Sequence, residues 1–201
     1  MPTLTRKGAA TRRRILDGAA AHIREFGVAA TTLDDVLART ATSKSQLFHY
    51  FPGGREELLL AVARLEADRV LEDQRPQLGD LTSWPAWWSW RDTVVERYRR
   101  QGGLCPLNAV TSHLGEGTPG ARAVVTGLMG RWQAELAAGV RHMQGAGEID
   151  PAVDPDRAAA ALLACVQGGV LIQMSTGETT HLEAALDMGI ASLRAGSFPA
   201  N

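Results

Sequence analysis

Apolar residues recur at steps of three and four along nearly all of this 201-residue chain, and no segment sustains a period-two alternation. In the first such stretch Ile15, Ala19 and Ile23 fall on one helical face. Signals that end helices, such as Gly27, and signals that start them, such as Asp154 before a proline, separate the stretches. The pattern predicts an all-α fold of roughly nine helices.

Three helices are expected near the N-terminus, and the second and third are short. The first ends at Phe26 before Gly27, and the second runs from a Thr32 cap to about Arg39. Ser43 and Gln46 have the spacing of a capping box, which starts a third helix that ends before Pro52. Two short helices joined by residues 40–42 describe a helix-turn-helix, whose second helix can enter the major groove of DNA.

Charge is divided unevenly along the chain. The formal net charge is −1. Residues 1–55 hold nine basic and four acidic residues, a net +5, whereas the rest holds 12 basic and 18 acidic residues, a net −6. A basic segment attached to an acidic body is typical of a protein that binds a polyanion through that segment.

The sequence from about residue 8 to 60 resembles the DNA-binding domain of the tetracycline-repressor (TetR) family. The matching features are T-R-R-R-I-L at 11–16, F-x-x-x-A-T-T at 26–32, S-K at 43–44, L-F-H-Y-F at 47–51 and a basic residue followed by E-x-L at 55–58. The chain departs from the family pattern at the turn and at the fourth helix. Ala41 stands where the turn commonly has glycine, and is strained if its φ is positive. Thr42 stands where the turn commonly has a buried valine, and Gly54 stands where the fourth helix commonly has a Ser or Asn cap.

The resemblance implies a helix-turn-helix domain over residues 1–54 and an effector-binding and dimerisation domain over 55–201. It implies that five polar residues of the third helix face DNA, and Thr32, Ser43 and Arg55 have side chains suited to phosphate. Gln46 can pair with adenine and Lys44 with guanine or phosphate, whereas a solvated surface is the alternative for the polar residues. Leu47, Phe48 and Phe51 are expected in the core. The predicted DNA-binding residues are Thr32, Ser43, Lys44, Ser45, Gln46, His49, Tyr50 and Arg55.

The body resembles the multidrug- and flavonoid-responsive subgroup of the family, on L-C-P-L-N at 104–108 and Trp132. This resemblance implies a small apolar or aromatic effector. Large, adaptable apolar side chains with polar handles suit such a pocket, although ordinary core packing is the alternative for each of them. The candidates are Trp87, Trp88, Trp90, Tyr98, Asn108, His113, Met129, Trp132, Gln167 and Met174.

The last two expected helices, about 155–175 and 179–195, are more apolar than one subunit needs and are rich in alanine and glycine. In the family the corresponding pair forms a dimer interface, and a two-fold dimer presents two recognition helices to a palindromic site. The alternative is that both helices form an intramolecular core.

Other classes of function have weaker support. Cys105 and His113 form a conceivable nucleophile pair without an accompanying acid or oxyanion element, the five histidines lack metal-ligand spacing, and no cofactor is expected. The expected localisation is cytoplasmic, since two distant cysteines suit a reducing compartment and no leader or membrane span is expected.

These observations predict a homodimeric DNA-binding transcriptional regulator, a repressor that an effector releases from operator DNA. The alternative is a small-molecule-binding protein with a vestigial DNA-binding head.

Overall fold

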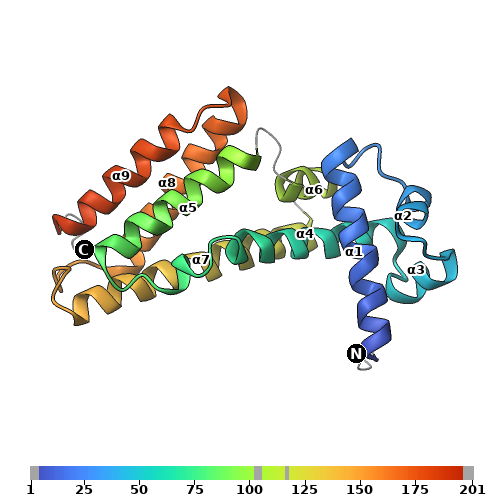
Figure 1. Cartoon of the computed structure of the whole chain (residues 1–201), viewed down its shortest axis with the longest axis horizontal. Coiled ribbons are helices and arrows are strands. Elements are labelled where there is room, and N and C mark those ends of the chain that lie inside the picture. Colours follow the sequence, from blue (N-terminus) through green and yellow to red (C-terminus); the bar gives the residue numbers. More distant parts are fainter. Residues whose placement is uncertain (1–4, 102–105, 116–117, 197–201) are drawn as a thin grey trace. The chain divides into compact units, whose positions relative to one another are not determined.

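The computed structural model describes residues 5–101, 106–115 and 118–196, which contain nine α-helices, one 3-10 helix and no strand (Figure 1). The predicted all-α fold is confirmed. The helices are α1 (Arg6–Phe26), α2 (Leu33–Thr40), α3 (Lys44–Tyr50), α4 (Gly54–Glu72), α5 (Trp84–Gln101), α6 (Pro106–Leu114), α7 (Pro119–Gly145), α8 (Pro155–Thr176) and α9 (Thr180–Arg194), with the 3-10 helix η1 (Gln77–Gly79) before α5.

The chain divides into two compact units. The first takes its residues from Met1–Arg69 and Pro106–Val125, and the second from Val70–Cys105 and Thr126–Asn201. Helix α6 therefore folds with α1, α2, α3 and most of α4. The predicted boundary at residue 54 separates a DNA-binding part from an effector-binding part. That functional division stays a prediction.

Local capping sets several helix ends where the sequence predicts them. The amide of Gly27 donates to the Ile23 carbonyl at 2.8 Å and closes α1. The Asp154 carboxylate accepts from the amides of Asp156 and Arg157 at the start of α8. These bonds satisfy backbone groups that a helix end leaves open.

An apolar core and a chain of ion pairs hold the first unit together. Helix α1 contacts both α2 and α3. Glu66 of α4, whose side chain is 7% exposed, accepts from Arg24 at 2.9 Å and from Arg69 at 2.6 Å. Arg69 also binds Asp17 at 2.7 Å, and Asp17 binds Arg13 at 2.9 Å. These contacts join α1 to α4 through side chains that share partners.

In the second unit α8 and α9 lie side by side, and α5 also contacts α9 (Figure 1). Gly169 of α8 and Gly189 of α9 are both buried and lie close to side chains of the other helix. A Cβ on Gly169 would lie 2.5 Å from the Cα of Leu182, and one on Gly189 would lie 2.6 Å from a methyl group of Leu162. The small residues predicted from the sequence thus serve the contact between α8 and α9.

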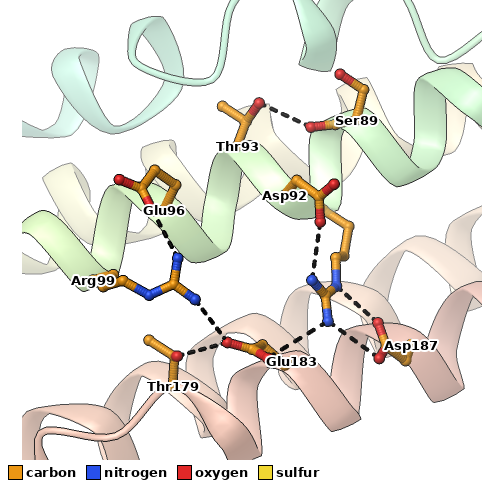
Figure 2. A network of polar contacts seen from close by, with 9 residues as sticks. Ser89, Asp92, Thr93, Glu96, Arg99, Thr179, Glu183 and Asp187 are labelled. Carbon is orange, nitrogen blue, oxygen red and sulfur yellow. Dashed lines mark hydrogen bonds and ion pairs between the residues drawn. The ribbon is translucent and has the colours of Figure 1, made fainter.

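Ion pairs join α5 to α9 on their polar sides. Arg91 donates to both carboxylate oxygens of Asp187, at 2.7 and 3.1 Å. Figure 2 shows the neighbouring contacts, in which Arg99 bridges Glu96 of α5 and Glu183 of α9 at 2.7 and 3.0 Å. A hydrogen bond from Thr179, with both arginines nearby, lowers the pKa of Glu183.

By length and composition alone, helix α8 is long and apolar enough to cross a membrane. Of its most apolar stretch of 18 residues, 44% is buried within the protein. Core helices of water-soluble proteins pass the same test. The buried side includes Leu162 and Val166, whereas Leu171 is 66% exposed.

Candidate DNA-binding site

A complete capping box starts α2. The Thr32 hydroxyl accepts from the Asp35 amide at 3.2 Å, and the Asp35 carboxylate accepts from the Thr32 amide at 2.9 Å. Hydrogen bonds from the Thr32 hydroxyl and amide lower the pKa of the Asp35 carboxyl group. Thr32 is exposed, so its hydroxyl lies at the surface where the sequence predicts a phosphate contact.

The turn between α2 and α3 contains a strained alanine. Ala41 has φ 47° and ψ 47°, and it is the one non-glycine residue with positive φ among those that the structure describes. The flanking threonines are buried, and the Thr40 hydroxyl donates to the Thr42 hydroxyl at 2.9 Å. Both buried hydroxyls of the turn therefore have partners, but the backbone of Ala41 adopts a strained conformation that glycine tolerates.

Helix α3 presents a polar face. Leu47 and Phe51 are fully buried, which confirms them as core residues, whereas Phe48 is 39% exposed and its predicted place in the core is wrong. The physical reason is that this helix of seven residues packs one face only. The exposed polar residues are Ser43, Lys44, Ser45, Gln46 and His49, with Tyr50 partly exposed.

The predicted capping box of α3 is present and involves Gln46. The Gln46 amide donates to the Ser43 hydroxyl at 3.2 Å, and the Gln46 side-chain oxygen accepts from the Ser43 amide at 3.1 Å. A bidentate contact with adenine uses both the oxygen and the nitrogen of a glutamine side chain. Such a contact requires Gln46 to exchange its capping bond for one to the base.

Arg55, at the start of α4, has partners within the first unit. Its guanidinium donates to the carbonyls of Val28 and Thr31 at 2.8 and 3.2 Å and contacts Nε2 of His113 at 3.0 Å. The predicted contact of Arg55 with phosphate stays a prediction. Sequence reasoning missed these partners because they lie 24 or more positions away.

The basic residues that precede Arg55 differ in their partners. Arg13, Arg24 and Arg39 form ion pairs with acidic side chains, and Arg12 lies over the ring of Phe51 at 5.2 Å. In the ranges that the structure describes, no ion-pair partner is found for Arg6, Lys7, Arg14 and Lys44, three of which lie on α1. An uncompensated cation of this kind attracts phosphate.

The structure distributes the ten predicted effector-binding residues over both units. Asn108 and His113 lie on α6 in the first unit and are exposed. Four are buried in the second unit, namely Trp87, Trp90, Tyr98 and Trp132. The other four also belong to the second unit: Trp88, Met129, Gln167 and Met174. Leu104 and Cys105, which the sequence motif and the nucleophile pair invoke, lie outside the described residues.

The buried indoles differ in hydrogen bonding. Trp90 donates to the side chain of Gln74 at 2.8 Å, and Gln74 in turn donates to the Val70 carbonyl at 2.7 Å, so Trp90 has the partners of a core residue. For Trp87 and Trp132 the described residues offer the indole N–H no acceptor. A buried donor without an acceptor costs about 1–3 kcal/mol, which makes these two indoles candidates for a polar ligand contact. Gln74, in the turn after α4, was missed because a single glutamine carries no sequence signal of burial.

A short helix with an exposed polar face, set after a tight turn in a basic three-helix unit, defines a helix-turn-helix DNA-binding protein. Family models bear this out. Residues 15–62 match the model described as bacterial regulatory proteins, tetR family, and residues 87–188 match the tetracyclin repressor-like C-terminal domain. The chain belongs to the TetR family of transcriptional regulators.

Individual relatives agree with this assignment. An uncharacterized HTH-type transcriptional regulator of Mycobacterium tuberculosis is 31% identical over 111 residues, which cover 52% of this chain and 54% of the relative, so the match spans about half of that protein's length. A TetR transcriptional regulator from Chloroflexus aurantiacus superposes with a TM-score of 0.72 at 26% identity, over 94% of this chain and 96% of the other. SmeT, the repressor of a multidrug efflux pump of Stenotrophomonas maltophilia, shares the fold in its complex with triclosan, with a TM-score of 0.68 at 22% identity over 96% of each chain.

Proposed function

We propose that this chain is a homodimeric repressor that binds a palindromic operator through α3 and leaves it when a small apolar or aromatic effector binds. The observation that carries the proposal is the exposed polar face of α3 above a buried Leu47. In this proposal Lys44, Ser45, Gln46, His49 and Tyr50 contact the DNA, and Thr32, Ser43 and Arg55 are the phosphate candidates.

The direct test is binding to an operator selected from random duplexes. Lys44→Ala and Tyr50→Ala are expected to weaken binding with unchanged helix content, because both side chains lie on the surface of α3. Arg122→Ala, which removes one exposed charge from α7, is the matched control. Full affinity in both α3 variants would refute the assignment of α3 as the recognition helix.

The proposed dimer uses the outer faces of α8 and α9. Leu171 and Ile172 of α8 are 66% and 38% exposed, and Met188 of α9 is 67% exposed. Exposed alanines and Gly168 accompany them, so a second copy of the chain can approach closely. Burying such a face removes apolar surface from water in both copies.

Sedimentation of Met188→Glu and of Ala138→Glu tests the dimer. The first places a charge in the proposed interface and the second places one on an exposed position of α7. We expect a monomer for the first variant and a dimer for the second. A monomeric wild-type protein at micromolar concentration contradicts the proposal.

The proposed effector combines a flat apolar body with a hydrogen-bond acceptor for Trp87 or Trp132. Triclosan is a suitable first probe, since SmeT is seen in complex with it. We expect quenching of tryptophan fluorescence and release of operator DNA, both weakened in Trp87→Phe and Trp132→Phe. Trp84→Phe is the control, because the Trp84 indole already donates to Glu148 at 3.0 Å. A panel of flat aromatic compounds that neither quenches nor releases DNA overturns this part of the proposal.

A small-molecule-binding protein with a vestigial head is the second candidate. It differs in one measurable respect, because a repressor that contacts phosphates loses operator affinity as salt rises. The proposal also includes that the protein has no catalytic activity and is located in the cytoplasm.

A further inference from the structure

The loop between α1 and α2, residues 27–32, sets the position at which the helix-turn-helix begins. Its last residue, Thr32, caps α2. Val28 and Thr31 are buried, at 6% and 4% exposure. The Thr31 hydroxyl donates to the Gly27 carbonyl at 2.7 Å and lies 3.1 Å from Nδ1 of His22. The loop is therefore an ordered part of the unit whose geometry fixes the start of α2.

Arg55 binds this loop from α4. Nη2 donates to the Val28 carbonyl at 2.8 Å, and Nε donates to the Thr31 carbonyl at 3.2 Å. Two donors of one planar guanidinium thus hold two carbonyls of the same loop. Lysine offers a single ammonium group at this position and does not reproduce this fork.

The third contact of Arg55 reaches α6. Nη1 lies 3.0 Å from Nε2 of His113. Because arginine has donors only, a hydrogen bond between the two side chains uses Nε2 of His113 as the acceptor. Helix α6 buries Leu107, Val110 and Thr111 within the first unit, whereas His113 is exposed. The Arg55 guanidinium therefore connects α6 directly to the loop that precedes α2.

We propose that Arg55 acts as a positioning residue, which couples α6 through His113 to the 27–32 loop and thereby orients the helix-turn-helix for operator binding. This role differs from a phosphate contact, which the sequence alone suggests for a basic residue at the start of α4. Of the five N–H donors of the guanidinium, three are directed at protein acceptors. The inference rests on the proposed operator binding.

The experiment separates positioning from phosphate contact by salt dependence. Removing a phosphate contact lowers the slope of log affinity against log salt by about one, and Lys44→Ala serves as the standard for this effect. We expect Arg55→Gln, which removes the charge, and His113→Ala to lower operator affinity about tenfold at unchanged slope, since each loses a charge-assisted hydrogen bond. His113→Gln retains an acceptor for Nη1 and is expected to bind nearly as the wild type does.

Amide hydrogen exchange of residues 27–36 in the free protein tests the same coupling without DNA. We expect faster exchange in Arg55→Lys and His113→Ala and wild-type exchange in His113→Gln. The double variant Arg55→Gln with His113→Ala is expected to lose no more affinity than Arg55→Gln alone, because Arg55→Gln already breaks the contact that His113→Ala removes.

Two results overturn the inference. One is a salt slope that falls by about one in Arg55→Gln, which identifies a phosphate contact. The other is amide exchange of the loop at the wild-type rate in His113→Ala. This result would show that His113 is not coupled to the loop, whatever the operator affinity of the variant. A wild-type protein that binds no duplex refutes the proposed function instead, and the exchange measurement still decides the role of Arg55.

Discussion

Adjacent glycines on α8 provide a matched pair for testing how α8 and α9 pack. A Cβ on Gly169 would lie 2.5 Å from the Cα and 2.8 Å from the Cβ of Leu182, whereas a Cβ on Gly168 meets nothing within 4 Å. Both substitutions to alanine gain about 1 kcal/mol of helix propensity. Only Gly169→Ala also overpacks a contact, which costs about 1–3 kcal/mol, and the backbone of α9 has to move because the clash involves a Cα atom.

We therefore expect the free energy of unfolding to rise by about 1 kcal/mol in Gly168→Ala and to fall by up to about 2 kcal/mol in Gly169→Ala. The assay is guanidinium chloride unfolding of both variants and the wild type. Each is measured at two protein concentrations, because association links stability to concentration. Equal stability of the two variants would falsify the close approach of α8 and α9 at Gly169.

Three further substitutions test single contacts. Ala41→Gly removes the strain of a positive φ and is expected to raise the free energy of unfolding by about 1 kcal/mol; a decrease contradicts the left-handed conformation. The Asp35 pKa lies below its ordinary value of 3.8, so its capping bond stabilises the protein above that pH and is lost as the pH falls further. In a series of unfolding curves at falling pH, Asp35→Asn is expected to reduce the loss of unfolding free energy at acid pH. An unchanged loss argues against the capping box of Thr32 and Asp35. Gln74→Leu leaves the Trp90 indole without its acceptor and is expected to cost about 1–3 kcal/mol in thermal unfolding, whereas a neutral effect shows that water replaces Gln74.

The helices and their ends were predictable because their signals are local. The bonds of Ser43 with Gln46 and of Gly27 with Ile23 involve residues within four positions of one another, so residue type and spacing suffice to predict them. The strain at Ala41 was predictable for a similar reason, since a tight turn restricts φ whatever packs around it. The exposure of Phe48 was not predictable, because it depends on which face of α3 packs against the rest of the first unit.

Contacts between distant residues were beyond the sequence. Arg55 looks like a surface cation at the start of a helix, yet its partners come from residues 28, 31 and 113. His113 looks like a polar handle for an effector, yet α6 folds within the first unit. No local pattern distinguishes these alternatives, because the choice depends on how helices far apart in the chain pack together.

The same limit explains what the charge division does and does not mean. A net +5 over residues 1–55 points to a polyanion, but the count treats every cation as equal. Arg13 and Arg24 belong to the ion-pair chain that joins α1 to α4, and Arg39 pairs with Glu25, so part of the positive charge stabilises the unit. The charge available to phosphate is concentrated on α1 and at Lys44 of α3. Net charge therefore indicates the class of partner, whereas the internal ion pairs decide which cations remain for it.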